Sequence, residues 1–238
     1  MEPWYRLALL ILRPATNAVF RRDESGQHHI PSTGGCVMAA NHISFADPFV
    51  AAVFVHDAGR RPRFMGKESV FRIPVLGRII RGARQIPVFR ESADAAHALS
   101  AAIDAVRAGE CVVIYPEGTV TQDPDYWPMV AKTGVARLAL ATGTPVIPLA
   151  QWGAQDFLGR SGRPRLRGRT RVVVRAGAPV DLSRWTGEEL NAQVLREATE
   201  AVMTALRILV GEIRGETPPA LPYDHRAIRG GDPSRRTA

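Results

Sequence analysis

A histidine and an aspartate stand five positions apart in the stretch NHISFAD, residues 41–47 of the 238-residue chain. Five residues of helix turn by roughly 500°, so on one helix the side chains of His42 and Asp47 would point about 140° apart. The two can meet only if the backbone bends between them. If they meet, the carboxylate holds one ring nitrogen and leaves the other as a general base.

The flanking sequence supplies such a bend. The apolar run GGCVMAAN follows the turn signal PSTGG and predicts a buried strand that ends near Asn41. Asp47 is a good helix N-cap and Pro48 suits a first helical position, so DPFVAAVFVHDAG predicts a helix. At a helix N-terminus the Asp47 carboxylate is expected to stay ionised. The alternative is that Asp47 only caps the helix and His42 is a hydrogen-bonded loop residue.

Further groups that could do chemistry lie after other predicted strands. The apolar run CVVIY leads into PEGT, residues 116–119, which puts the charge of Glu117 at the mouth of the sheet and lets Gly118 approach a ligand closely. Lys67 and Arg90 add cations, and Arg suits bidentate recognition of phosphate. Each of these has a plainer alternative, either a solvated turn or a surface charge.

The sequence shows no nucleophile suited to a covalent route. Ser44 lacks a G-x-S-x-G elbow. The two cysteines, Cys36 and Cys111, stand in apolar runs that predict buried thiols. No HExxH or CxxC pattern indicates a metal site. A base at His42 is therefore expected to act on a hydroxyl or a water belonging to the substrate.

Taken together, these motifs resemble a known family. NHISFAD resembles the N-H-x4-D signature of the 1-acylglycerol-3-phosphate acyltransferase-like (PlsC-type) glycerolipid acyltransferases. The stretches KESVFRIPVLG, QIPVFR, YPEGT and VIPLA are similar, in that order, to the later blocks of the family, and the resemblance spans roughly residues 41–150. The long apolar N-terminal region of many members is shortened here to one amphipathic stretch.

The resemblance implies an O-acyltransferase. His42, oriented by Asp47, would deprotonate a hydroxyl of a lysophospholipid or glycerol phosphate, and the oxygen would attack the thioester of acyl-CoA or acyl carrier protein. The thioester is a co-substrate, and neither a metal nor another cofactor is implied. Lys67 and Arg90 would hold the phosphate of the acceptor. The remaining pocket residues implied by the resemblance are Glu117, Gly118 and Thr119.

One position departs from the family pattern. The family's E-G-T-R reads E-G-T-V here, so Val120 stands where a phosphate-binding Arg is expected. Lys132, in the segment AKTGVARLA, is a candidate to supply the missing cation. The alternative is that the acceptor is another lysolipid or a glycolipid.

The order of predicted elements indicates the fold class. Strands and helices alternate from about residue 35 to 180, which predicts an α/β fold with a mostly parallel or mixed sheet flanked by helices. Ligand sites in such sheets lie beyond the carboxyl ends of the strands, where NHISFAD and PEGT fall. A helix is expected over residues 129–143, and a capping box from Thr186 to Glu189 predicts the start of a long last helix. The predicted regions are an amphipathic membrane-interface segment 1–25, an acyltransferase domain 26–215 and a disordered basic tail 216–238.

The N-terminal segment has the composition of a helix that lies on a membrane. Its apolar run LALLIL has six residues, whereas a spanning helix needs about 20. Trp4 and Tyr5 flank the run and arginines surround it, as in interfacial helices. We therefore expect peripheral or monotopic association with the cytoplasmic face of the cell membrane. The alternative is a terminal helix packed on the core.

The charge balance indicates partners that carry phosphate. Lys and Arg number 31 against 23 Asp and Glu, which gives a net charge of +8. The Arg-rich stretch 160–175 has no interleaved aromatic residues for base stacking, and no helix-turn-helix signature stands out. We expect an anionic membrane surface, or the phosphates of CoA, and no nucleic acid. The alternatives are a charge-protected edge strand, or a non-catalytic basic protein that binds membranes or nucleic acid.

Overall fold

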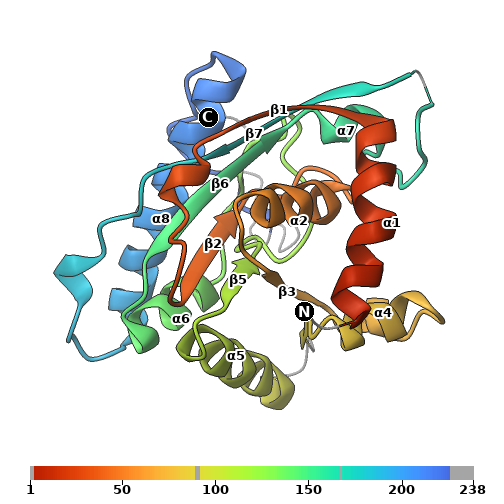
Figure 1. The fold of residues 1–238 in the computed structure, drawn as a ribbon. Helices are drawn as coiled ribbons and strands as arrows, with labels where there is room; N and C mark the ends of the chain where they lie inside the picture. The colour runs from red at the N-terminus through yellow and green to blue at the C-terminus, as the bar shows by residue number, and fades with distance from the viewer. Residues whose placement is uncertain (1–2, 89–91, 167, 226–238) are drawn as a thin grey trace.

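A twisted sheet runs through the centre of the molecule (Figure 1). The computed structural model describes residues 3–88, 92–166 and 168–225, and within them seven strands form one sheet in the order β1-β7-β6-β2-β5-β3-β4. Neighbouring strands run parallel except β6 and β7, which are antiparallel. The strands are β1 Phe20–Ser25, β2 Cys36–Ala40, β3 Pro62–Lys67, β4 Ile86–Val88, β5 Cys111–Ile114, β6 Val146–Trp152 and β7 Thr170–Ala176.

Helices cover both faces of the sheet, which confirms the predicted α/β architecture (Figure 1). Phe54 of α2 packs in a core with Met38 on one face, and Leu138 of α6 packs in a second core with Val37 on the other. The helices are α1 Pro3–Val19, α2 Asp47–Asp57, α3 Glu68–Phe71, α4 Leu76–Gly82, α5 Ser92–Arg107, α6 Gly134–Thr142, α7 Ala154–Phe157 and α8 Ala192–Arg214, with short 3-10 turns at Gln27–His29 and Ser183–Trp185.

The central strands are buried on both sides, and this explains their unbroken apolar sequences. In β2 the side chains alternate: Met38 points toward the core below α2, while Val37 and Ala39 point toward the opposite core. β2 and β5 pair in register from Cys36 and Cys111 onward. The two strands therefore end at the same edge, and the loops that carry His42 and Glu117 lie side by side there.

Two helix starts differ from the predictions. The last helix begins at Ala192, and the side chain of Asn191 accepts hydrogen bonds from the amides of Gln193 and Val194. The predicted capping box from Thr186 to Glu189 is therefore wrong, because Gly187 adopts a left-handed φ of 85° that ends the local turn. The helix predicted over 129–143 spans only Gly134–Thr142, and before it the amides of Val130 and Lys132 donate to the carbonyls of Tyr223 and Pro116 in distant segments.

The two ends of the chain pack on the sheet domain. α1 continues through Pro14, and its residues Tyr5 and Thr16 are buried. Residues 20–25, which fall in the predicted N-terminal segment, form β1 and pair with β7. In the predicted tail, the carbonyl of Tyr223 accepts a hydrogen bond of 3.0 Å from the amide of Val130, and residues 226–238 lie outside the described residues. Among the described residues, no helix is both long and apolar enough to cross a membrane.

Candidate active site

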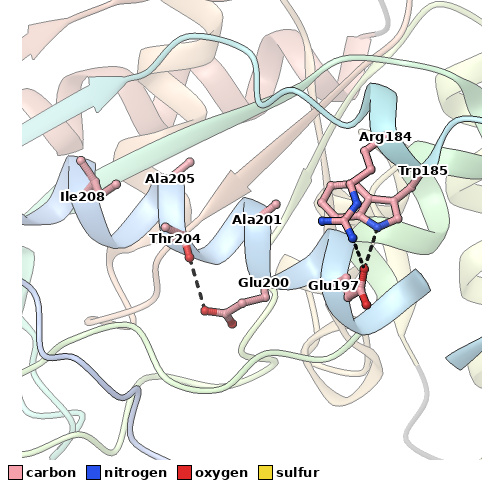
Figure 2. Close-up of a pocket in the computed structure, with 8 residues that line it drawn as sticks. All are labelled: Arg184, Trp185, Glu197, Glu200, Ala201, Thr204, Ala205 and Ile208. Atoms are coloured by element: carbon pink, nitrogen blue, oxygen red, sulfur yellow. Dashed lines mark hydrogen bonds and ion pairs between the residues drawn. The ribbon is translucent and has the colours of Figure 1, made fainter. Parts of the chain in front are cut away.

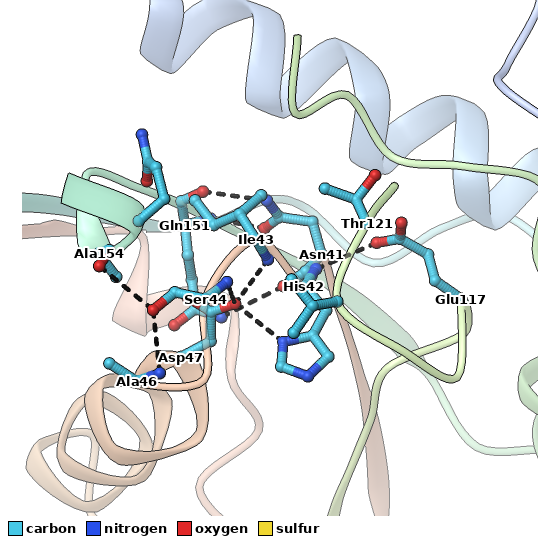
Figure 3. A network of polar contacts seen from close by, with 12 residues as sticks. Asn41, His42, Ile43, Ser44, Ala46, Asp47, Glu117, Thr121, Gln151 and Ala154 are labelled. Atoms are coloured by element: carbon cyan, nitrogen blue, oxygen red, sulfur yellow. Dashed lines mark hydrogen bonds and ion pairs between the residues drawn. The ribbon is translucent and has the colours of Figure 1, made fainter. Parts of the chain in front are cut away.

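The side chains of His42 and Asp47 meet in a tight turn between β2 and α2 (Figure 3). Asp47 Oδ2 accepts three hydrogen bonds: from His42 Nδ1 at 2.9 Å, from the Ile43 amide at 2.7 Å and from the Ser44 amide at 2.8 Å. The predicted bend and the predicted contact are confirmed. Because Nδ1 is engaged, Nε2 is the ring nitrogen that can take a proton from a substrate.

The role of Asp47 in the helix start differs from the prediction. Ala46 is the N-cap of α2 and Asp47 is the first helical residue, with its carboxylate turned back toward the loop. Asp47 is fully buried, and this burial raises its pKa, while the hydrogen bond from His42 and the amides of Ser44 and Ile43 act in the opposite direction. Ionisation of Asp47 therefore depends on these loop donors rather than on the free amides of the helix.

Buried polar residues to which the sequence assigned no role in the site hold this turn in place (Figure 3). Asn41 joins β2 to β6 through two bonds with the main chain of Gln151, at 3.0 and 2.8 Å. The Ser44 hydroxyl donates to the carbonyl of Leu158 at 2.6 Å and accepts from the Ala46 amide at 2.9 Å. Ser44 is thus a structural residue of the turn. Only the position of Asn41 directly before His42 could have indicated such a role.

Glu117 joins the two loops instead of facing solvent at the mouth of the sheet. Its Oε1 accepts from the His42 amide and its Oε2 from the Met129 amide, both at 3.0 Å, and the residue is 5% exposed. Burial raises the pKa of Glu117 to about 8, against the opposing effect of the two amides. The carboxyl group therefore fixes the backbone that carries His42.

Stability should accordingly depend on the protonation of Glu117. A folded-state pKa of about 8, above the ordinary 4.5, means that this stability is full below pH 4.5 and is lost as the pH rises toward 8. The pKa of Asp47 is also raised, so Asp47 likewise makes the protein less stable as the pH rises. We expect the urea midpoint to fall from pH 5 to pH 8, and Glu117→Gln to lower stability by about 1–3 kcal/mol at pH 5, because its amide group cannot accept both bonds.

The control for this prediction is the exposed Glu188→Gln. We expect the Glu117 variant to lose at least half of the slope of stability against pH, and the Glu188 variant to keep it. An unchanged slope in Glu117→Gln would show that folding does not raise the pKa of this carboxyl.

The predicted cations occupy different positions. The side chain of Lys132 lies over Gly118, so that its Nζ is 3.2 Å from where a Cβ on that glycine would be. Lys67 is exposed at the end of β3, the strand next to β5. Arg90 lies outside the described residues. Lys132 precedes α6, and its amide donates to the carbonyl of Pro116 at 2.9 Å, which ties it to the PEGT turn.

Thr119 and Val120 follow Gly118 with opposite exposure. Thr119 is exposed, whereas Val120 is 4% exposed and so does not contribute to the open surface of the loop. The next amide, of Thr121, donates to the carbonyl of His42 at 2.6 Å. The PEGT loop thus contacts the His42 turn through Glu117 and Thr121, and presents Thr119 and Lys132 outward.

A groove of about 690 Å³ lies elsewhere, along the outer side of α8 (Figure 2). Its polar groups pair with each other: Glu197 accepts from Trp185 Nε1 at 3.2 Å and lies 3.6 Å from Arg184. No residue of the His42 turn lines it. In the part of the chain that the structure describes, no group of three or more His, Cys, Asp or Glu side chains is placed to hold a metal ion.

Known proteins share this sequence pattern. The model of a family described as Acyltransferase matches residues 21–152. The chain is 30% identical over 134 residues to a 1-acyl-sn-glycerol-3-phosphate acyltransferase of Borreliella burgdorferi, covering 56% of this chain and 52% of that protein. It is 28% identical over 171 residues to an uncharacterised protein of Mycobacterium leprae, covering 66% of this chain and 43% of that protein. The chain thus spans about half the length of these relatives.

A solved structure shares the fold. The crystal structure of the 1-acyl-sn-glycerophosphate (LPA) acyltransferase PlsC from Thermotoga maritima superposes with a TM-score of 0.68 at 24% identity, covering 90% of this chain and 81% of the other. The likeness extends beyond residues 21–152, so that it includes most of the elements around the sheet.

Proposed function

Because the chain belongs to the Acyltransferase family, we propose that it moves a fatty acyl group from an acyl thioester to a hydroxyl of a lysophospholipid or glycerol phosphate. The observation that carries this proposal is the hydrogen bond of 2.9 Å between His42 Nδ1 and the buried carboxylate of Asp47, at the edge of the sheet where the PEGT loop also lies. Such a pair is a general base with a fixed tautomer.

In the proposed reaction, His42 Nε2 takes the proton of the acceptor hydroxyl as the oxygen attacks the thioester carbonyl. The tetrahedral oxyanion collapses, the carbon–sulfur bond breaks and the thiolate of CoA or acyl carrier protein leaves. The imidazolium can return its proton to that thiolate. Asp47 stabilises the imidazolium and keeps its own charge. No acyl-enzyme, metal or cofactor takes part in this scheme.

We propose that Lys132 supplies the cation for the phosphate of the acceptor. Support comes from its Nζ, which lies over Gly118 beside the exposed Thr119, whereas Val120 is buried and uncharged. Lys67, at the end of the neighbouring strand β3, and Arg90 complete the proposed set of cations. The substitution of Val120 for Arg favours a second candidate, an acceptor that is another lysolipid or a glycolipid.

Removing the cation of Lys132 should weaken binding of phosphorylated acceptors. We expect Lys132→Ala to raise KM for a lysophosphatidate by roughly 10- to 100-fold, the cost of one lost charge-assisted hydrogen bond. The control, Arg137→Ala, removes an exposed cation from α6 and should leave KM unchanged. An equal rise of KM in both variants would indicate a general electrostatic effect of positive charge instead of a contact between Lys132 and the phosphate.

A panel of acceptors tests the function itself. Lysophosphatidate, other lysophospholipids, glycerol 3-phosphate and glycolipids are offered with labelled acyl-CoA or acyl carrier protein, and products are identified by mass spectrometry. We expect acylation of at least one phosphorylated acceptor. Preference for an unphosphorylated one would favour the second candidate, and Val120→Arg in the same panel tests whether the missing cation sets the choice. No ester product from any acceptor would contradict acyl transfer.

We also propose that α1 holds the protein on the cytoplasmic face of the membrane as a peripheral or monotopic protein. Support comes from apolar side chains that α1 leaves exposed between arginines. They are Trp4, Leu7, Leu10 and Ile11. α1 packs against α2 and α4, so this helix lies on the same side of the sheet as α2, which carries Asp47 (Figure 1).

The turn before α4, a helix that packs against α1, also exposes apolar side chains. Val75 is 67% exposed and has φ 65° and ψ −62°, with Pro74 O accepting from Leu76 N at 2.8 Å. This γ-turn is strained for a β-branched residue, and such strain is found mostly where function requires it. Ile73 is also exposed beside it. A bilayer rich in anionic lipid would contact both segments.

Charge placed on α1 should therefore release the protein from vesicles. We expect the double variant Leu10→Glu and Ile11→Glu to lower partitioning onto phosphatidylglycerol vesicles at physiological salt by about 10-fold or more, because apolar burial is replaced by charge. The matched control is Ile208→Glu, an exposed apolar residue of α8 on the other face. If the control variant loses as much vesicle binding as the double variant, or the double variant loses none, α1 is not the segment that contacts the membrane.

A further inference from the structure

Three rings from neighbouring strands stack below the candidate active site. The centroids of His42 and Tyr115 lie 4.4 Å apart with planes at 30°, and those of Tyr115 and Phe64 lie 6.5 Å apart with planes at 17°. β2, β5 and β3 are adjacent in the sheet: His42 and Tyr115 lie just after β2 and β5, and Phe64 lies within β3. The imidazole of His42 thus rests on the face of a phenol ring that takes no part in the proposed proton transfer.

The hydroxyl end of the Tyr115 ring is buried. Its hydroxyl is buried near the side-chain amide of Gln151, and the main chain of Gln151 is bonded to Asn41. Burial and then the negative charge of Asp47 raise the pKa of Tyr115 well above its ordinary range, so the phenol is neutral. The Tyr115 hydroxyl and Gln151 Oε1 are both buried, and neither has a hydrogen-bond partner among the described residues.

We propose that Tyr115 is a positioning residue that acts through His42: its ring face holds the imidazole against Asp47 and stabilises the imidazolium created by proton abstraction. A cation within about 6 Å of an aromatic centroid is attracted by the negative face of the ring. The distance of 4.4 Å meets that condition.

This inference rests on the proposed function for its kinetic consequences but not for its physical basis. Among the described residues, the titratable groups that contact His42 are Asp47 from α2 and, from the loop after β5, Tyr115 and Glu117. Of these, only the ring of Tyr115 can be removed without loss of a hydrogen bond to His42. Variants at this position therefore isolate its effect on the imidazolium.

Two variants separate the ring from the hydroxyl. Tyr115→Leu removes the ring, and we expect the acidic limb of the pH–rate profile to move to lower pH by about 0.5 unit, as a cation–π contact predicts. We expect kcat to fall about 5-fold, because the imidazole loses its support, while KM for acyl-CoA stays unchanged. Tyr115→Phe keeps the ring, so its profile should match the wild type even if its stability is lower.

A measurement that needs no turnover keeps the test independent of the proposed reaction. The His42 signals, assigned by their loss in His42→Gln, are titrated by proton NMR in the wild type and in both variants. We expect ring-current shifts of the His42 protons in the wild type and in Tyr115→Phe, and a lower titration midpoint in Tyr115→Leu. If Tyr115→Leu does not fold, Tyr115→Met provides a second ring-free side chain.

The results that would overturn the proposal are equally concrete. Three results would each show that the stack does not act on the imidazole. The titration midpoint of His42 could be equal in the wild type and the ring-free variant, it could fall as much in Tyr115→Phe as in Tyr115→Leu, or the His42 protons of the wild type could show no ring-current shift. Normal NMR behaviour in a protein without acyl transfer would instead contradict the proposed function and leave the His42–Tyr115 coupling established.

Discussion

Replacing His42 by Ala is expected to lower kcat for acyl transfer by about 10²- to 10⁴-fold, the usual contribution of a positioned general base. His42 is the side chain whose Nδ1 is fixed by Asp47, which leaves Nε2 for the acceptor proton. Its side chain is 15% exposed, so truncation opens no enclosed cavity. Asp47 also keeps the amides of Ile43 and Ser44 as donors. The turn should therefore persist, and vesicle binding and the urea midpoint should stay near those of the wild type.

The measurement is single-turnover transfer of a labelled acyl chain, with vesicle binding recorded on the same samples. His28→Ala is the matched control, because His28 lies in the turn at Gln27–His29, away from the His42 loop. A His42→Ala variant that keeps full turnover would refute the assignment of the base. Lost turnover together with lost folding would make the variant uninformative for rate, and His42→Gln, which conserves volume, would then replace it.

The part of the site formed by residues 41–47 could be predicted from the sequence. The apolar run before Asn41, the spacing to Asp47 and the Asp-Pro pair predict a strand-to-helix turn, and the structure has that turn between β2 and α2. These features are local because steric and hydrogen-bonding preferences of neighbouring residues determine them. Alternation of strands and helices similarly predicts the layered architecture.

Contacts between distant segments could not be predicted in this way. Glu117 after a proline at a strand end has the pattern of a solvated turn, yet the segment that carries Met129 folds over it and supplies a donor. Lys132 was expected in a helix, but it extends along the PEGT turn instead. In both cases the pairing of β2 with β5 and the path of a long loop decide the environment, and neither leaves a periodic signal in the sequence.

Competition between local signals explains the error at the last helix. Thr186 and Glu189 have the spacing of a capping box, but Asn191 is also a strong N-cap residue five positions after Thr186. The left-handed Gly187 separates the two candidates, and the 3-10 turn Ser183–Trp185 precedes it. Trp185 Nε1 donates to Glu197 of α8, so the turn before Gly187 is bonded to the helix that starts later.

Asp47 should tolerate an amide better than the corresponding residue of a catalytic triad does. In a triad, Asp→Asn lowers kcat by about 10⁴-fold because the amide reverses the histidine tautomer. Here His42 Nδ1 and the amides of Ile43 and Ser44 all donate to one oxygen, Oδ2. In the variant Asp47→Asn, the two backbone donors would hold the side-chain oxygen in that place, so His42 would keep its tautomer.

The expected result is therefore graded. Asp47→Asn should lower kcat by roughly 10- to 100-fold, because a charge-assisted bond to the imidazolium becomes a neutral one, and should move the acidic limb of the pH–rate profile to lower pH. Asp47→Ala should lower kcat by about 10³-fold, since the ring loses its anchor and two buried amides lose their acceptor. Equal losses of kcat in both variants would show that Asp47 provides charge and not orientation. A loss near 10⁴-fold in Asp47→Asn would show that the Asn side-chain amide turns its NH₂ group toward His42 and reverses the tautomer.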